Sequence, residues 1–307
     1  MKKLVFCLSL CGFILAGCSR NEPAVEPDGD RQVVIFFKES KSASSLKSAG
    51  TEEEDALEKV ILYGIDGLGV IIFTDTIDHP SPAGDEVTMS RMVETLYAIA
   101  NPSNDLETVL ESVELSDNVS DLTTLVNDFS DAPESPFLMG GKGAVPPSGF
   151  SVTVNLVRAV AKIEIIALNE FEITTVTVLN TSTKGYVFEQ STFSLPSSLD
   201  RDDYAPVPPT SATMDTTILY VAESPKENPV EFEVTGVFTG VGDLYGKTAT
   251  FSIILQQDGV DIDIVRNTRY RVRITPITEW KYDIEFFIVP WNEVEADIVE
   301  IPDEDFI

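Results

Sequence analysis

The chain has 307 residues, of which 43% are hydrophobic and 23% charged, a composition that supports a packed core rather than disorder. This length is sufficient for two ordinary domains. The formal net charge of −30 argues against nucleic acid as a partner, because phosphate binding requires a basic surface.

The N-terminus has the anatomy of a bacterial lipoprotein signal, assigned here to residues 1–17. Lys2 and Lys3 form a positive region, an apolar run follows, and residues 15–18 read L-A-G-C, the lipobox. The apolar run is shorter than the roughly 20 residues of a permanent membrane span. We therefore expect cleavage before Cys18, lipidation of Cys18 and attachment to the outer membrane at the cell surface. An ordinary secretory signal with a chance cysteine is the alternative.

Little in the mature chain suggests catalysis. Cys7 and Cys11 leave with the signal, so no thiol remains for a disulfide, a metal or a nucleophile. His79, the single histidine, stands in the turn-like sequence HPSP. The stretch DGVDID at 258–263 lacks the glycine and terminal glutamate of an EF-hand and favours a hairpin. We expect neither an enzyme nor a cofactor or metal.

In the N-terminal half, residues 18–31 read as a flexible acidic tether and residues 32–148 as the first domain. An apolar run at 32–37 predicts a buried strand, followed by an exposed Ser- and Lys-bearing loop at 38–50. The acidic run at 52–55 is interpreted as a solvated edge or turn. Asp66 and Gly67 between apolar runs predict a hairpin with a type I′ turn. Residues 104–113 and 117–129 have helical apolar stripes, with Ser116 or Asp117 as a cap for the second.

The strongest strand signal lies at 150–168, where Val152, Val154 and Leu156 alternate with polar residues. Arg158 and Lys162 are interpreted as solvent-facing charges on one face of this strand. Further strands are expected at 173–180, 217–221, 230–238, 249–255, 270–275 and 282–289. The second domain is therefore nearly all β, and the Gly/Pro loop at 140–149 places its start at residue 149.

The stretch LVRAVAKIEI at 156–165, together with the lipobox, resembles the fimbrillin family of Bacteroidetes, the lipoprotein-derived subunits of type V pili and their accessory proteins. Four further segments carry the resemblance across most of the mature chain: YAIAN at 97–101, PFLMGG at 136–141, RNTRYRVRI at 266–274 and VPWNE at 289–293. The resemblance implies a mainly β protein of two tandem transthyretin-like β-sandwich domains, with a few short helices in the first. It also favours a strand at 94–100, where the pattern alone fits helix or strand.

The resemblance implies a role as a pilus subunit, in a stalk, accessory or anchor position, that joins other fimbrial subunits by donor-strand exchange. In pilus-forming members a protease cuts after an arginine and removes the first strand, and a strand of the next subunit fills the groove. The candidate removable strand here comprises Val33, Val34, Ile35, Phe36 and Phe37. The candidate donor strand carries Val294, Ala296 and Ile298 on one face. Alternatively, residues 291–301 close their own C-terminal sheet.

The chain departs from the family pattern because it has no arginine between Arg31 and Arg91. A cut in the loop after the first strand would need to follow Lys38, Lys41 or Lys47, and Lys47 is the best placed. An uncleaved anchor or accessory subunit is therefore favoured.

The alternative function is a surface lipoprotein that binds a glycan or host ligand and does not polymerise. The aromatic residues available for such a site are Trp280, Tyr282 and Trp291. Both tryptophans stand beside predicted strands, however, where packing in the core is the expected role.

Overall fold

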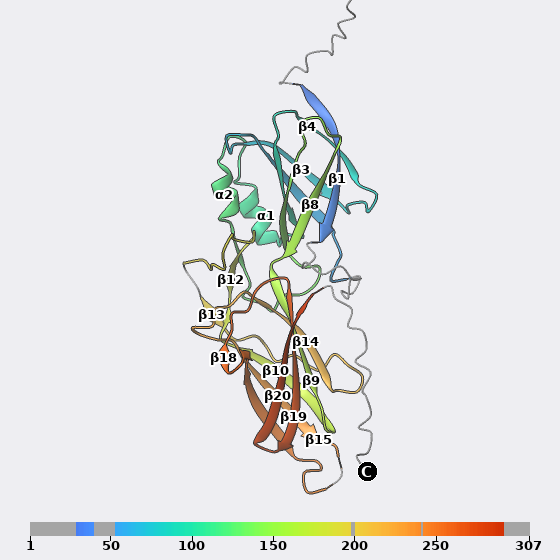
Figure 1. Ribbon diagram of the computed structural model, residues 1–307, viewed down its shortest axis with the longest axis vertical. Coiled ribbons are helices and arrows are strands. Elements are labelled where there is room, and N and C mark those ends of the chain that lie inside the picture. Colours follow the sequence, from blue (N-terminus) through green and yellow to red (C-terminus); the bar gives the residue numbers. More distant parts are fainter. Residues whose placement is uncertain (1–28, 40–52, 198–199, 241, 292–307) are drawn as a thin grey trace, which may run out of the picture.

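Two β-rich halves follow one another along the long axis of the molecule, the N-terminal half uppermost in Figure 1. The computed structural model describes residues 29–39, 53–197, 200–240 and 242–291. The expected mainly β class, with short helices confined to the first half, is confirmed. The transthyretin-like topology remains a prediction.

A single curled sheet forms the N-terminal half. Its strands lie in the order β3 (Ile71–Asp78), β2 (Lys59–Ile65), β5 (Thr95–Ala100), β7 (Met139–Ala144), β8 (Ser151–Arg158), β1 (Asp30–Glu39) and β4 (Asp85–Ser90). The sheet curls so far that its outer strands, β3 and β4, come into contact. Alternate residues of each strand, such as Val152, Val154 and Leu156 of β8, fill the core inside the curl.

Two short helices cover the other face of this sheet, as Figure 1 shows. Ser103 caps α1 (Asn104–Leu110), and Asn118 caps α2 (Val119–Thr123) with a reciprocal capping box. The second predicted helix is therefore too long and its predicted cap is wrong, because the chain leaves α2 to form β6 (Val126–Asp128). Neither helix in the described chain has the length and apolar character to cross a bilayer.

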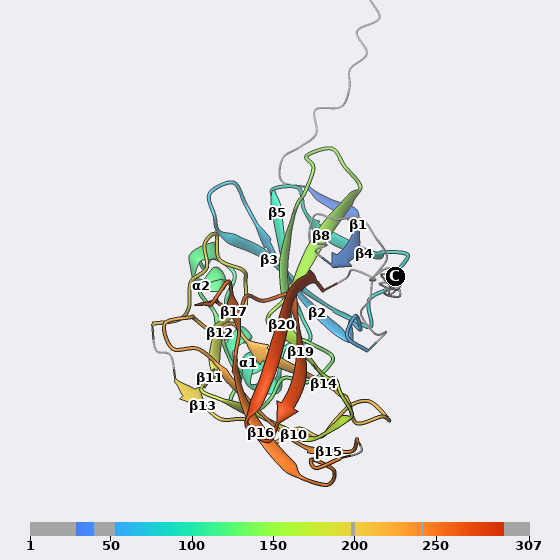
Figure 2. The same cartoon turned by 60° about the horizontal axis from the view of Figure 1, so that its bottom comes forward.

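The C-terminal half is a sandwich of two sheets. One contains β14 (Thr216–Ala222), β9 (Val160–Ala167), β19 (Thr268–Thr278) and β20 (Lys281–Pro290), in that order. The other contains β10 (Phe171–Leu179), β15 (Glu231–Phe238) and β16 (Thr248–Ile254). Their facing apolar side chains form one core, and Figure 2 shows β19 and β20 side by side in front of it. The six further strands predicted in this half are confirmed as β10, β14, β15, β16, β19 and β20.

Three two-stranded sheets complete the described fold. They pair β11 (Thr181–Ser182) with β13 (Arg201–Asp202), β12 (Lys184–Tyr186) with β6, and β17 (Gln256–Gln257) with β18 (Val260–Asp261). The β6–β12 pair joins the two halves. Asp258 and Gly259, both with positive φ, make the predicted hairpin turn between β17 and β18.

Between β2 and β3 the predicted hairpin is present, but its turn is not the expected two-residue type. Positive φ occurs at Gly69 rather than at Asp66 and Gly67. The Asp66 carboxylate instead accepts hydrogen bonds from the backbone of Leu68 and Val70, which stabilises a longer loop.

The apolar run at 150–168 is two strands rather than one. β8 belongs to the N-terminal sheet and β9 to the C-terminal sandwich, with Ala159 between them. The Gly/Pro loop merely joins β7 to β8 within one sheet. Residue 149, where the sequence analysis starts the second domain, therefore lies between two paired strands of the N-terminal sheet. The division into domains stays a prediction.

Candidate functional site

The first strand occupies an interior position in the N-terminal sheet. β1 pairs parallel with β8 and antiparallel with β4, so both of its edges are hydrogen-bonded. Val33 and Ile35 are buried in the core, while Val34, Phe36 and Phe37 are partly covered. The predicted buried strand is confirmed. Its removal would open a slot between β8 and β4.

The two ends of β1 differ in their accessibility. Arg31 is 6% exposed and donates hydrogen bonds to the carbonyls of Pro146, Pro147 and Val93. Lys38 is exposed but lies within the strand, opposite Asn155 of β8. A protease would therefore have to open the sheet to cut beside either residue. Lys41 and Lys47 lie outside the described residues.

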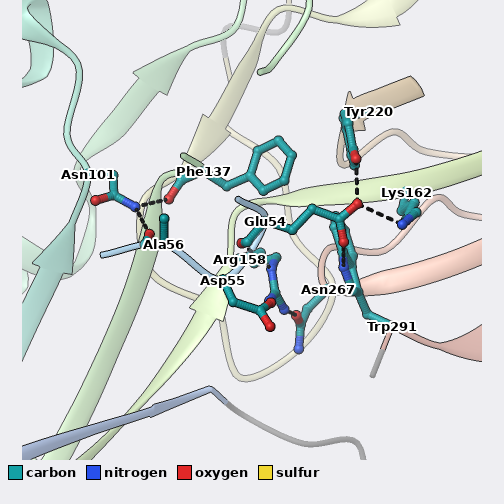
Figure 3. Close-up of polar contacts among 10 residues, drawn as sticks. All are labelled: Glu54, Asp55, Ala56, Asn101, Phe137, Arg158, Lys162, Tyr220, Asn267 and Trp291. Carbon is teal, nitrogen blue, oxygen red and sulfur yellow. Dashed lines mark hydrogen bonds and ion pairs between the residues drawn. The ribbon is translucent and has the colours of Figure 1, made fainter. Parts of the chain in front are cut away.

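The described structure resumes at residue 53, at the junction between the two halves. There the Glu54 carboxylate accepts hydrogen bonds from Lys162 Nζ at 2.6 Å, from the Tyr220 hydroxyl at 2.5 Å and from Trp291 Nε1 at 3.1 Å (Figure 3). These donors come from β9, from β14 and from the residue after β20. Glu54 is 3% exposed, so the predicted solvated role of the acidic run is wrong at this position.

Arg158 joins the same cluster from the end of β8. Its guanidinium forms an ion pair with Asp55 and donates to the Glu54 carbonyl at 3.3 Å and to Asn267 Oδ1 at 3.2 Å. It also lies 4.8 Å from the Trp291 ring centroid, a cation–π contact. Arg158 and Lys162 are 1% and 5% exposed, so the prediction of solvent-facing charges is wrong. They also stand on different strands of different sheets.

Electrostatics keep the Glu54 carboxyl ionised. Burial alone would raise its pKa, but hydrogen bonds from Lys162, Tyr220 and Trp291, with the Lys162 charge, hold the pKa below its ordinary value. Burial and the neighbouring carboxylate raise the pKa of Tyr220. The phenol therefore remains a hydrogen-bond donor at neutral pH.

An apolar and backbone frame surrounds this ion-pair cluster. The Trp291 ring stacks on Tyr220 at 5.8 Å and meets Phe137 edge-on at the same distance. Asn101, with a positive φ, donates to the carbonyls of Ala56 and Phe137 at 2.8 and 3.0 Å. Segment 53–58 is thus fixed to both halves of the molecule.

The remaining predicted residues are dispersed. Trp280 is 78% exposed in the β19–β20 turn, so its predicted core position is wrong, whereas Trp291 is 1% exposed, as predicted. Tyr282 packs against Phe251 and donates to the Ser252 carbonyl. Because Trp291 is buried, the three aromatic residues do not share an exposed surface. Cys18, Val294, Ala296 and Ile298 lie outside the described residues, which also contain no group of ligands able to hold a metal ion.

One feature of the sequence does indicate that Arg158 is buried at the junction, although Arg158 was interpreted as solvent-facing. Arg158 continues the two-residue period of Val152, Val154 and Leu156, and it therefore falls on the buried face of β8. No comparable signal marks Glu54, whose partner Lys162 is 108 residues away.

Comparison with known proteins agrees with this architecture. Similar solved structures include a cell adhesion protein from Bacteroides eggerthii (TM-score 0.61, 14% identity, 87% of this chain and 97% of that one). Another is the tip fimbrial protein Mfa3 from Porphyromonas gingivalis (TM-score 0.58, 15% identity, 85% and 100%). At these identities the likeness shows the fold. No curated protein matches the chain.

Family membership rests on a sequence match that covers most of the chain. Residues 66–297 match the family model of the fimbrillin-A associated anchor proteins Mfa1 and Mfa2. The matched region includes every described element from the β2–β3 turn to Trp291. The chain therefore belongs to the family of fimbrillin-A associated anchor proteins Mfa1 and Mfa2.

Proposed function

We propose that this protein is a lipid-anchored surface subunit of a fimbria, in an anchor or accessory position, that joins neighbouring subunits by strand insertion. Family membership supports the fimbrial role. The lipobox at residues 15–18 supports the lipid anchor on Cys18. The observation that carries the strand-insertion part is the position of β1, an interior strand held between β8 and β4.

Exchange of β1 requires a replacement strand. Val33 and Ile35 are 1% and 0% exposed, and full burial of such a side chain contributes about 1.5–3 kcal/mol. The backbone of β1 is also paired on both edges. A departing β1 would leave these groups uncompensated unless an incoming strand restored the same contacts. A cut in the loop after β1 therefore permits exchange but does not drive it.

The anchor or accessory position follows from the processing residues. Arg31 is buried, no arginine occurs between it and Arg91, and Lys38 lies within β1. Lys41 and Lys47 are the remaining candidates for a cut. A subunit that keeps β1 and its lipid would attach a fimbria to the outer membrane and contribute its C-terminal residues, including Val294, Ala296 and Ile298, to a neighbour.

Mapping the N-terminus of protein recovered from whole cells tests this assignment. Mass spectrometry should find an acylated Cys18 terminus, and a Cys18→Ser variant should leave the membrane fraction. An abundant species that begins after Lys38, Lys41 or Lys47 would instead identify a processed stalk subunit. A chain that ends at Trp291 should fold and yet lose assembly, and normal assembly by this chain would exclude donation by the C-terminal residues.

A further inference from the structure

Figure 1 shows α1 and α2 on one face of the N-terminal sheet, and a small cavity opens on this face. The cavity has a volume of about 260 Å³ and is surrounded by β5, β7, β8, α2 and the chain after β12. Every residue that lines it belongs to the described structure, and none belongs to the Glu54 cluster. The cavity is therefore a feature of the N-terminal half that the junction does not use.

The floor of the cavity is bare backbone of β7. A Cβ atom at Gly140 would lie 2.5 Å from the Val187 carbonyl oxygen and 3.1 Å from the Phe188 ring, so only glycine lets the chain after β12 lie this close to the strand. Any larger residue at this position would occupy the floor and displace Phe188. Gly140 therefore keeps the cavity open.

Two aromatic side chains form a wall of the cavity. The rings of Tyr97 and Phe188 meet edge-on with their centroids 5.3 Å apart, and Phe188 is buried while Tyr97 is partly exposed. In the sheet register Tyr97 stands opposite Lys142, and Lys142 stands opposite Asn155. These three side chains therefore form one row on the same face of the sheet, and the Lys142 ammonium lies 5.7 Å from the Tyr97 ring centroid.

A polar rim surrounds this wall, and the protein leaves several of its groups unused. Lys142 and Asn155 are exposed, and neither side chain has a hydrogen-bond partner in the described part of the chain. The Gln190 amide donates from Nε2 to two backbone carbonyls at 2.9 and 3.2 Å, which fixes the side chain and leaves its Oε1 as an acceptor. Glu189 adds an exposed carboxylate. The rim therefore presents both donors and acceptors beside an apolar wall.

The wall, the rim and the size of the cavity select the class of ligand. Strands β5, β7 and β8 are each paired on both edges, so the cavity offers no backbone edge to an added strand. Its lining contains one cation and one anion, Lys142 and Glu189, so it has no excess positive charge for a phosphate. Its volume is below the roughly 300–1,000 Å³ of sites for drug-sized ligands, which favours a single ring. A pyranose fits these conditions, because it combines apolar C–H surface with hydroxyl groups that both donate and accept.

We propose that this cavity binds one pyranose residue of a glycan, with the C–H face of the sugar on the aromatic wall and its hydroxyl groups on the polar rim. Because the cavity accommodates one ring, the expected partner is a terminal or branch sugar. The site is distinct from the three aromatic residues that the sequence suggested for glycan binding. It depends neither on strand insertion nor on lipid attachment, so a fimbrial subunit would bind the sugar while it remains part of a fibre.

Saturation-transfer NMR on the full mature chain, made soluble by Cys18→Ser, tests the proposal with the methyl glycosides of glucose, galactose, mannose and N-acetylglucosamine as probes. At least one probe should bind with a dissociation constant on the order of 1 mM, as expected for a ligand of this size. The variant Lys142→Ala/Asn155→Ala should bind this probe about tenfold more weakly, because it loses two polar groups of the rim. The matched control Lys281→Ala/Gln257→Ala removes one exposed lysine and one exposed amide from the C-terminal half and should bind the probe as the unmodified chain does.

A steric variant provides a second test. Asn155→Trp places a large side chain at the exposed mouth of the cavity and should abolish binding, while the thermal unfolding of this variant should match that of the unmodified chain. The proposal is overturned if none of the four probes binds the unmodified chain, or if the rim and mouth variants bind the sugar as tightly as the unmodified chain. Variants that bind the sugar normally and yet fail to assemble would also overturn it, because the cavity would then hold part of a neighbouring subunit.

Discussion

Replacing Glu54 by glutamine should weaken the junction between the two halves of the molecule. The Glu54 and Lys162 side chains are 4% and 7% exposed, so their charges are almost fully removed from water. Glutamine would leave the Lys162 ammonium buried without a counter-charge, and its amide NH₂ would compete with three groups that all donate. Removing one partner of a buried ion pair typically costs about 3–5 kcal/mol.

Thermal and denaturant unfolding of the soluble chain would measure this loss. At about 2 °C per kcal/mol for a chain of this size, Tm should fall by roughly 6–10 °C. Glu107→Gln is the matched control, because Glu107 pairs with Lys59 at a site where both side chains are about one third exposed. That substitution should change the free energy of unfolding by less than about 1 kcal/mol.

A second substitution separates the ion pair from simple loss of packing. Glu54→Gln/Lys162→Met should be more stable than Glu54→Gln alone, because the double variant no longer buries an uncompensated ammonium. The reasoning fails if Glu54→Gln unfolds within about 1 kcal/mol of the unmodified chain. It also fails if Lys162→Met brings no recovery.

Three further predictions follow from the same structure. The pKa of Glu54 is held below its unfolded value, so the contribution of the Glu54 carboxylate to the free energy of unfolding is present above the unfolded pKa and is lost as pH falls through the folded pKa. Denaturation at pH 7 and pH 3 should therefore show that the difference in stability between Glu54→Gln and the unmodified chain becomes smaller at low pH. Trp291→Ala should cost about 3–5 kcal/mol in urea unfolding, whereas Trp280→Ala, at a 78% exposed position, should stay within about 0.5 kcal/mol; similar losses would contradict the junction assignment. Gly141→Ala would place a Cβ 2.1 Å from the Asn155 carbonyl oxygen and should cost about 1–3 kcal/mol in the same assay, while Gly67→Ala meets only the flexible end of Glu94 and should be nearly neutral.

Local patterns in the sequence predict the strands well but not their assignment to sheets. An apolar run identified β1, and β10, β15 and β19 were also predicted as strands; each has one face on a core. Local patterns could not divide residues 150–168, since β8 and β9 are both apolar and only Ala159 separates them. The division depends on which strands lie alongside, which is a long-range property of the fold.

The junction was harder to predict because its parts are far apart in the chain. The folded structure brings together Glu54, Lys162, Tyr220 and Trp291, which are far apart in the sequence. In the sequence, Glu54 belongs to a run of acids of the kind usually found in water, and Trp280 and Trp291 both stand beside strands. What distinguishes the two tryptophans is that one lies in a hairpin turn and the other beneath segment 53–58.

The position of Trp291 has a mechanical consequence. The described chain begins near the outer end of the N-terminal half and ends at the junction between the two halves, not at the far end of the C-terminal sandwich (Figure 1). A pulling force applied between the start of β1 and the residues after Trp291 is therefore carried by the N-terminal sheet and the Glu54 cluster. The strands β9, β14 and β19 support the end of this force path at the junction. The three-stranded sheet of β10, β15 and β16 lies off the line of force and is free to vary without weakening it.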